Sequence, residues 1–174
     1  GFREFVPFTT ICNFSQIKEN VFQYVKVMNL ENQNIVKKND LLFLMSSETL
    51  EDIAKSSVYL LDQESFLNSF CKGFRFIEKH SSIFINYLIN SNNYRAYFNL
   101  VGRGFTRINI KQEFVNSVYV LLPPFSEQQK IADYLDKQTT KIDQTIALKT
   151  AHIEKLKEYK SVLINDVVTG KVRV

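Results

Sequence analysis

The chain has 174 residues, of which 45% are hydrophobic and 13% aromatic, enough to bury one core with one extended appendage but too few for two full domains. No stretch approaches the roughly 18 uninterrupted apolar residues of a membrane span. The two cysteines, Cys12 and Cys71, form neither a CxxC pair nor a Cys/His cluster, so we expect no disulfide framework, no metal site and a cytoplasmic protein with reduced thiols.

Charge is unevenly distributed along the chain, although the net charge is only +4. Residues 31–64 carry three basic and seven acidic side chains, a balance of −4. Residues 72–111 carry seven basic side chains and one acidic, a balance of +6. Such a segment suits a polyanion if its side chains converge on one face. The alternative is an ordinary solvated surface.

The first 122 residues predict short strands and short helices. Alternating or continuous apolar runs, which are typical of strands, occupy residues 24–28, 40–45, 57–61 and 70–77. Ser81 and Ser82 can cap a helix that extends through Ile89, and a second short helix is predicted over residues 94–101.

A turn and a final strand are predicted to close this part of the chain. Residues 102–104 contain two glycines and indicate a flexible turn. Residues 116–122 predict a strand that ends at the pair Pro123 and Pro124, because proline cannot donate to a strand ladder.

A long helix is predicted directly after the proline pair. Ser126 stands at the cap position with Gln129 three residues later, the pattern of a capping box. No glycine or proline follows until Gly170, so residues 126–168 predict one helix of 43 residues, about 65 Å long.

The long helix carries a heptad seam that indicates a coiled coil. Eight of its eleven core positions are apolar, namely Ala132, Leu135, Ile142, Ile146, Ile153, Leu156, Leu163 and Val167. One helix of this length cannot bury such a seam against so small a body, so we expect a partner helix. The alternative is a helix of an ordinary bundle.

Signatures of catalysis are missing from the sequence. Leu122 begins a Leu-Pro-Pro-Phe run that resembles the motif of amino-methyltransferases, but leucine cannot accept the hydrogen bond that this motif needs. The run at residues 102–104 is only Gly-x-Gly, and no phosphate-binding loop is present. The Glu-x-Lys at residues 158–160 falls inside the predicted long helix. We therefore predict no catalytic residue and no cofactor.

Polar and basic side chains remain as candidate DNA contacts. Arginine and asparagine can read guanine and adenine with paired hydrogen bonds, and short hydroxyls can bind phosphates or base edges. The candidate DNA-contacting residues are Ser46, Ser47, Thr49, Lys72, Arg75, Arg103, Thr106, Arg107 and Asn109. Among them, we predict a base contact for Arg107 and a phosphate contact for Lys72.

Five segments resemble the specificity subunits of type I restriction-modification systems. Residues 121–136 look like the junction between a target-recognition domain and a conserved spacer helix, and residues 153–172 are similar to the end of such a helix. Residues 39–43, 46–49 and 103–109 resemble recurring stretches of the recognition domains. The first 23 residues depart from the family pattern.

This resemblance implies an α+β fold, with a small mixed α/β target-recognition domain over residues 1–123 and a coiled-coil spacer helix over residues 124–174. It implies a non-catalytic subunit that binds one half of a bipartite site on double-stranded DNA. The implied protein partners are methyltransferase subunits and, through them, restriction subunits. A complete family member has two domains and two antiparallel helices, whereas this chain has one of each. The second helix comes either from the same longer subunit or from the mate in a homodimer.

Two other classes of function remain open. A scaffold protein could use the helix to oligomerise and the globular part to bind protein, and it would lack the steep salt dependence of DNA binding. A DNA enzyme with unfamiliar motifs would turn over DNA with a methyl donor or Mg²⁺.

Overall fold

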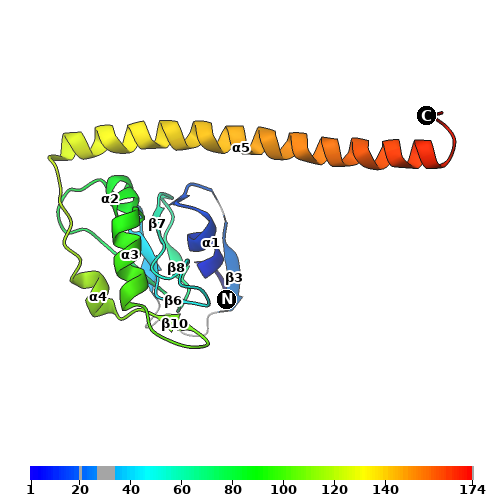
Figure 1. Cartoon of the computed structure of the whole chain (residues 1–174). Helices are drawn as coiled ribbons and strands as arrows, with labels where there is room; N and C mark the ends of the chain where they lie inside the picture. Colours follow the sequence, from blue (N-terminus) through cyan, green and yellow to red (C-terminus); the bar gives the residue numbers. More distant parts are fainter. Residues whose placement is uncertain (20, 27–33, 174) are drawn as a thin grey trace. The chain divides into compact units, whose positions relative to one another are not determined.

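The computed structural model describes residues 1–19, 21–26 and 34–173. The chain divides into two compact units, residues 1–132 and 133–174. Short strands and helices make up the first unit, and a long C-terminal helix continues into the second (Figure 1). The predicted α+β class is thereby confirmed.

The central sheet has the order β2-β7-β5-β9. Its strands are β2 (Gln16–Ile17), β7 (Ser56–Tyr59), β5 (Leu41–Leu44) and β9 (Cys71–Phe74). Strands β7 and β9 both pair with β5 in the antiparallel direction, so β5 lies between them. The strands predicted at 40–45, 57–61 and 70–77 are confirmed.

A second sheet has the order β3-β1-β8-β4. It contains β3 (Gln23–Lys26), β1 (Phe2–Val6), β8 (Ser65–Leu67) and β4 (Ile35–Val36). β3 confirms the first part of the strand predicted at 24–28, whereas Val27 and Met28 lie outside the described residues. A separate two-stranded ribbon joins β6 (Ser46–Ser47) to β10 (Ile108–Asn109).

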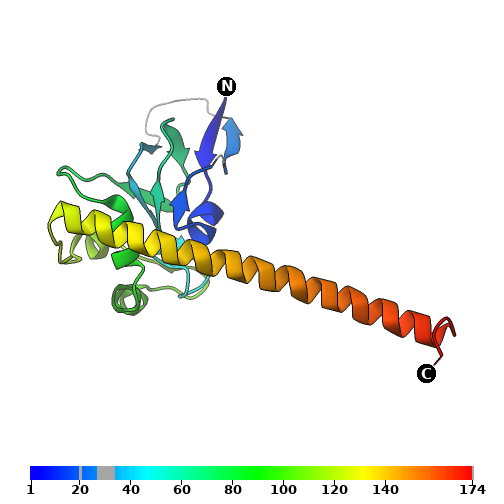
Figure 2. The same cartoon turned by 90° about the horizontal axis from the view of Figure 1, so that it is seen from above.

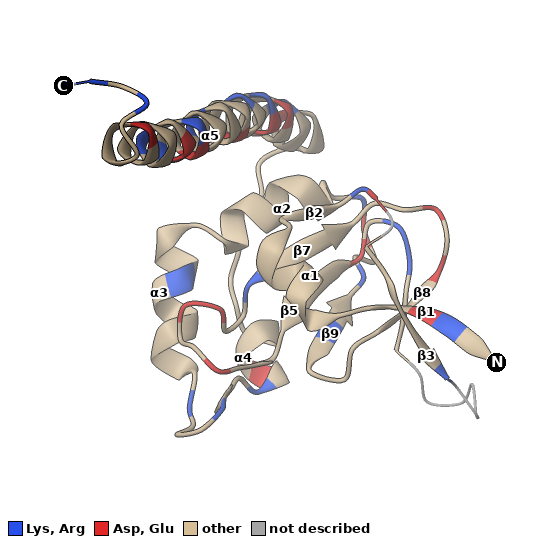
Figure 3. Cartoon of the chain, turned by 90° about the vertical axis from the view of Figure 1, so that its right-hand side faces the viewer, with Lys and Arg blue, Asp and Glu red and all other residues tan. Residues whose placement is uncertain are grey.

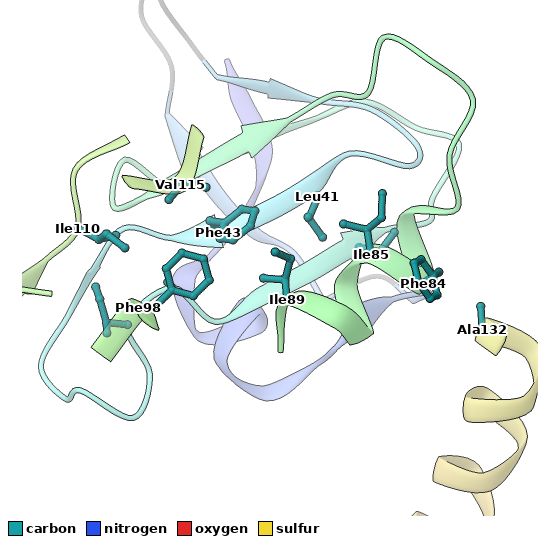
Figure 4. Close-up of a cluster of buried hydrophobic side chains, with 12 residues drawn as sticks. Leu41, Phe43, Phe84, Ile85, Ile89, Phe98, Ile110, Val115 and Ala132 are labelled. Carbon is teal, nitrogen blue, oxygen red and sulfur yellow. The ribbon is translucent and has the colours of Figure 1, made fainter. Parts of the chain in front are cut away.

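Strand β5 is buried on both faces, which is why its sequence is a continuous apolar run rather than an alternation. Leu41 and Phe43 belong to one core, with helix residues such as Phe98 (Figure 4). Leu42 and Leu44 belong to a second core on the opposite face. The sheet therefore separates two layers of apolar packing.

Helices cover the central sheet and carry much of the first core. They are α1 (Phe8–Asn13), α2 (Ser82–Ile89), α3 (Asn92–Val101) and α4 (Gln112–Asn116). Ser81 caps α2 as predicted, because its side chain accepts a hydrogen bond from the Phe84 N–H (3.3 Å). The second predicted helix is also confirmed, and it begins at Asn92, two residues earlier than expected.

The strand predicted at residues 116–122 is wrong. Asn116 ends α4, and the chain from residue 118 to 124 has no regular secondary structure. Val118 and Val120 pack against the core while Tyr119 and Leu121 are exposed. One-sided packing explains the apolar alternation, and no neighbouring strand pairs with this described segment.

The long helix α5 (Phe125–Val168) begins one residue before the predicted cap. Ser126 lies inside the first turn, so the predicted capping box is wrong. The N–H groups of Glu127 and Gln128 donate instead to the carbonyl of Pro124 (2.8 and 3.1 Å). The first eight residues of α5 belong to the N-terminal unit, which is why Ala132 is part of its core.

The side chain of Gln128 hydrogen-bonds the start of α5 to the rest of the N-terminal unit. It is only 2% exposed, its Oε1 accepts a hydrogen bond from the Ser81 N–H (2.9 Å), and its Nε2 donates to the Pro123 carbonyl (2.8 Å). A buried amide satisfied at both ends thus links the cap of α2 to the first turn of α5.

α5 has 44 residues and runs without interruption, about 66 Å at 1.5 Å per residue (Figures 1 and 2). It stops where Gly170 takes a φ of +74°, a left-handed conformation that favours glycine after a helix. The Lys171 N–H donates back to the Asp166 carbonyl (2.8 Å). The predicted helix end is confirmed.

We predict that Gln128→Leu destabilises the N-terminal unit. Leucine fits a buried site of similar size, but it leaves the Ser81 N–H and the Pro123 carbonyl without their partner, at about 1–3 kcal/mol for each orphaned group. Denaturant unfolding measures the loss. The exposed neighbour Gln129→Leu is the control and should change stability by less than about 0.5 kcal/mol. Equal stability of the two variants would contradict this role of Gln128.

Candidate nucleic-acid interface

The ribbon of β6 and β10 brings together candidates from two distant segments. In its register Ser46 pairs with Asn109, and Ser47 pairs with Ile108. Ser46 is partly exposed and Asn109 is exposed. Arg103, Thr106 and Arg107 lie in the loop that leads into β10, and all three are exposed. Six of the nine candidates therefore share one small region, which we call the ribbon loop surface: Ser46, Ser47, Arg103, Thr106, Arg107 and Asn109.

The hydroxyls of Ser47 and Thr49 order the turn after β6. Ser47 is buried, and its Oγ accepts a hydrogen bond from the Thr49 N–H (3.2 Å). Thr49 Oγ1 donates to Asp52 Oδ2 (2.9 Å) and accepts from the Asp52 N–H (3.1 Å). Hydrogen bonds from Lys55 first, and then from Thr49, lower the pKa of Asp52. In this structure both hydroxyls have local partners.

Arg103 lies at the C-terminal end of α3. Its guanidinium donates to the carbonyls of Leu100 and Gly102, the latter at 2.8 Å. Helix carbonyls in the last turn have no partner within the helix and attract positive charge. The structure therefore gives Arg103 a capping contact, alongside its predicted contact with DNA.

Arg107 rests on two side chains that the sequence did not connect to it. Its guanidinium carbon lies 4.5 Å from the centre of the Phe70 ring, and Nη2 lies 3.4 Å from Oε1 of Glu48. The Arg107 side chain is still 44% exposed. The Phe70 ring and the Glu48 carboxylate hold the guanidinium in place, and part of the guanidinium stays exposed to another partner.

Arg75 forms a paired contact with a buried carboxylate. Its Nε and Nη2 donate to the two oxygens of Asp40 at 2.8 and 2.7 Å, and the Lys37 N–H also donates to Asp40 (2.8 Å). The Asp40 side chain is 3% exposed, against 53% for Arg75. The hydrogen bond to Asp40 is the main cause that raises the pKa of Arg75.

Lys72 lies on strand β9 and Arg75 directly follows that strand. Both residues line a shallow pocket of about 280 Å³ next to Asp40. Lys72 is exposed on β9, opposite Phe43 in the register. The structure thus places Lys72 and Arg75 together, but not within the ribbon loop surface.

Several basic side chains of residues 72–111 have carboxylate or carbonyl partners within the protein. Arg75 and Arg107 have the carboxylate partners described above, and Lys111 Nζ lies 3.4 Å from Glu113 Oε1. Arg95 Nη2 donates a hydrogen bond to the Glu51 carbonyl (2.9 Å). Figure 3 shows acidic and basic segments interspersed over the N-terminal unit. Carboxylates from other segments therefore offset part of the balance of +6, and DNA would have to replace some of these internal partners.

The cysteines form no disulfide. Burial raises the pKa of the Cys71 thiol to about 12, and burial also raises the pKa of Cys12. Among the described residues, no group of three or more His, Cys, Asp and Glu side chains is arranged to hold a metal ion. Within that same part of the chain, no helix has both the length and the apolar character needed to cross a membrane.

The seam of α5 is exposed in the C-terminal unit taken by itself. Ile142, Ile146, Ile153 and Leu156 are each more than half exposed, and Leu163 is 43% exposed. Leu135 and Val167 are partly exposed.

Ala132 requires a correction. It is 3% exposed within the core of the N-terminal unit, near Phe84 in Figure 4. Because its methyl group is already covered, it cannot also serve as a pairing residue.

A family model for the type I restriction modification DNA specificity domain matches residues 3–158. The chain belongs to this family. The match confirms the resemblance seen in the sequence, and it includes the N-terminal stretch that departed from the family pattern by inspection.

Two relatives of this family are specificity subunits of named type I restriction enzymes. The EcoKI specificity subunit of Escherichia coli (strain K12) is 25% identical over 90% of this chain and 38% of its own length. The StySPI specificity subunit of Salmonella potsdam is 26% identical over 79% of this chain and 31% of its own length. The chain thus spans about a third of the length of these relatives.

The fold is also found in a solved chain from work on complex assembly and conformational transition of the type I restriction-modification system. The TM-score is 0.63 at 18% identity, over 92% of this chain and 36% of that chain. This likeness supports the architecture of the specificity domain described above.

We predict that Arg75→Ala destabilises this specificity domain, because it leaves the buried Asp40 carboxylate without its main partner. Hydrogen bonds to charged groups contribute about 1.5–3 kcal/mol, and half of the Arg75 side chain is exposed, so the lower part of that range is expected. Lys72→Ala on the preceding strand β9 is the control and should change stability by less than about 0.5 kcal/mol. Chemical denaturation compares the two. Unchanged stability of Arg75→Ala would contradict this structural role of Arg75.

Proposed function

We propose that this chain recognises double-stranded DNA as the specificity component of a type I restriction-modification complex. The observation that carries the proposal is the ribbon loop surface of a chain in the DNA specificity family, where exposed Arg107 and Asn109 stand beside Ser46. These side chains include the two types that bind guanine and adenine with paired hydrogen bonds.

In this proposal the two parts of the chain have different tasks. Residues 1–123 bind one half of a bipartite site, and residues 124–174 form the spacer helix. The relatives are named specificity subunits of restriction enzymes, which supports a chain without catalytic activity of its own. Methyltransferase subunits, and restriction subunits through them, would supply the chemistry on DNA in the cytoplasm.

The internal partners of the basic side chains shape how DNA would bind. Arg107 already has a carboxylate at 3.4 Å, so a guanine would compete with Glu48 for the same guanidinium. The Phe70 ring, 4.5 Å from the guanidinium carbon, would continue to orient the guanidinium when a base replaces Glu48. A base that accepts two hydrogen bonds from the guanidinium would displace Glu48, whereas a base placed to accept only one would not.

The test of this function compares Arg107→Ala with Lys72→Ala in the complex assembled with a methyltransferase subunit. Loss of a paired base contact costs about 1–3 kcal/mol, roughly 5- to 150-fold in affinity, and relaxes the preference at one base pair. Loss of a phosphate contact weakens all sequences nearly equally. Binding to a panel of site variants is measured at one fixed salt concentration, because affinity depends steeply on salt.

Two outcomes would contradict the proposal in different ways. If Arg107→Ala changes neither affinity nor base preference, the ribbon loop surface is not the reading surface. If duplex binding by the parent complex lacks any salt dependence, the alternative of a scaffold that binds protein is favoured instead.

We also propose that the seam of α5 pairs with a second spacer helix, from the same longer subunit or from a second copy. The apolar side chains of the seam are exposed along residues 142–163, and apolar surface of this extent is stabilised by burial against another helix. The polar seam positions Thr139, Lys149 and Lys160 would restrict the register of that pairing.

We predict that the double variant Ile146→Asp, Ile153→Asp abolishes self-association or capture of a second helix, because two buried carboxylates cannot be tolerated in the seam. The N-terminal unit should stay folded, since neither residue belongs to it. Sedimentation measures the association state. The matched control places the same charges at Gln144 and Ala151, which lie on the opposite side of the heptad. A parent chain that stays monomeric at high concentration and captures no helix would contradict the pairing.

A further inference from the structure

The loop of residues 103–109 is held in one conformation by its own backbone. The Arg103 N–H donates to the Asn109 carbonyl (3.1 Å), and the Asn109 N–H donates back to the Arg103 carbonyl (2.8 Å). The Asn109 side-chain amide also donates to the Arg107 carbonyl (3.2 Å). These three hydrogen bonds close the loop at its base.

Gly104 makes the tight course of this loop possible. Its φ is +147°, and a Cβ at this position would lie 1.8 Å from the Arg107 carbonyl oxygen. No side chain fits there, so the backbone can fold back closely on itself only with glycine. The residue that follows Gly104 is thereby presented at the tip of the loop.

That residue is Phe105, whose side chain is fully exposed (109%). Single exposed apolar side chains are common on protein surfaces, so exposure alone says little. Phe105 differs by its position, because it stands two residues from Arg107 on an ordered loop of the ribbon loop surface. Its ring is the large apolar group that this surface offers to a partner.

We propose that Phe105 contacts the 5-methyl group of a thymine in the major groove of the target site. The inference rests on the proposed function, in which the ribbon loop surface faces DNA. The thymine methyl is the apolar group among the polar base edges of the major groove, and phenylalanine is a side chain that contacts it. Phe105 is then a specificity residue that distinguishes thymine from cytosine at one position.

The distance along the chain limits where this thymine lies. Two extended residues span at most roughly 7 Å, and successive base pairs rise 3.4 Å along each strand. The Cα atoms of Phe105 and Arg107 are therefore no more than about two base-pair steps apart, so the thymine contacted by Phe105 belongs to the same half of the site as the base that Arg107 reads. Insertion of the ring between bases would require a base step to unstack, whereas contact at the groove edge requires no such deformation.

The experiment uses the complex assembled with a methyltransferase subunit, after methylome sequencing has defined its site. Each thymine of the site is replaced in turn by deoxyuridine, which lacks only the 5-methyl group. We expect the parent complex to lose about fourfold in affinity at one thymine, the equivalent of one buried methyl group at about 0.8 kcal/mol. Phe105→Ala should bind the unmodified site about fourfold more weakly and be insensitive to deoxyuridine at that position.

Two further variants support the assignment. Phe105→Leu keeps an apolar contact and should retain part of the sensitivity to deoxyuridine. Leu100→Ala removes an exposed apolar side chain (68%) that lies on α3, outside the loop, and should behave like the parent. The sensitive thymine should lie in the same half of the site as the position whose preference Arg107→Ala relaxes.

Three results would overturn the proposal. Phe105→Ala could retain the deoxyuridine sensitivity of the parent. It could weaken all sites equally while suppressing a rise in 2-aminopurine fluorescence, which would indicate a wedge between bases. It could fail to assemble with the methyltransferase subunit, which would indicate a protein contact. A parent complex with no base preference at any position refutes the proposed function itself, whereas base preference with full tolerance of deoxyuridine refutes only the thymine contact.

Discussion

The burial of β5 on both faces is the constraint on which the rest of the N-terminal unit depends. Leu41 and Phe43 need one apolar layer, and Leu42 and Leu44 need another. Helices α2, α3 and α4 therefore cover one side of the central sheet, and α1 together with the second sheet covers the other. The ribbon begins directly where this strand ends. The Met45 N–H donates to the Phe70 carbonyl (2.8 Å), and the Met45 carbonyl accepts from the Ile110 N–H (3.0 Å). Met45, which directly follows this buried strand, thus holds in place both Phe70, which supports Arg107, and the end of β10.

Ion pairs between distant segments are the second feature on which the structure depends. The acidic segment 31–64 and the basic segment 72–111 meet in pairs such as Asp40 with Arg75 and Glu48 with Arg107. The two pairs differ in burial. Asp40 is nearly inaccessible and Glu48 is 77% exposed, so breaking the first pair leaves a desolvated charge, whereas Glu48 can return to water. The exposed pair is therefore the one that a DNA base can open at low cost.

Local patterns predicted the elements whose form depends on their own residues. The continuous apolar run of β5, the Ser81 cap and the helix end near Gly170 are all confirmed. The errors fall where tertiary packing decides. The alternation at residues 118–121 comes from packing on one side of an irregular segment, and the start of α5 is set by buried Gln128 rather than by Ser126.

The candidate site divides in the same way. Arginine and asparagine near residues 103–109 could be singled out by residue type, and the register of β6 with β10 brings them to Ser46. The supports of Arg107 could not be found from the sequence, because Glu48 is 59 residues away and Phe70 is an ordinary aromatic residue in a strand pattern. Contacts between such distant segments follow from the sheet order, which no local periodicity encodes.

The two units also differ in how their apolar residues relate to their exposed surface. In the N-terminal unit, side chains that point outward from a closed core can be exchanged without loss of the fold, because the core residues are a separate set. In α5 the apolar side chains of the seam are themselves exposed, so a change there directly alters the surface that α5 offers to another helix. Ala132 lies where these two kinds of surface meet. It is a seam position by sequence, but the core of the N-terminal unit already buries it.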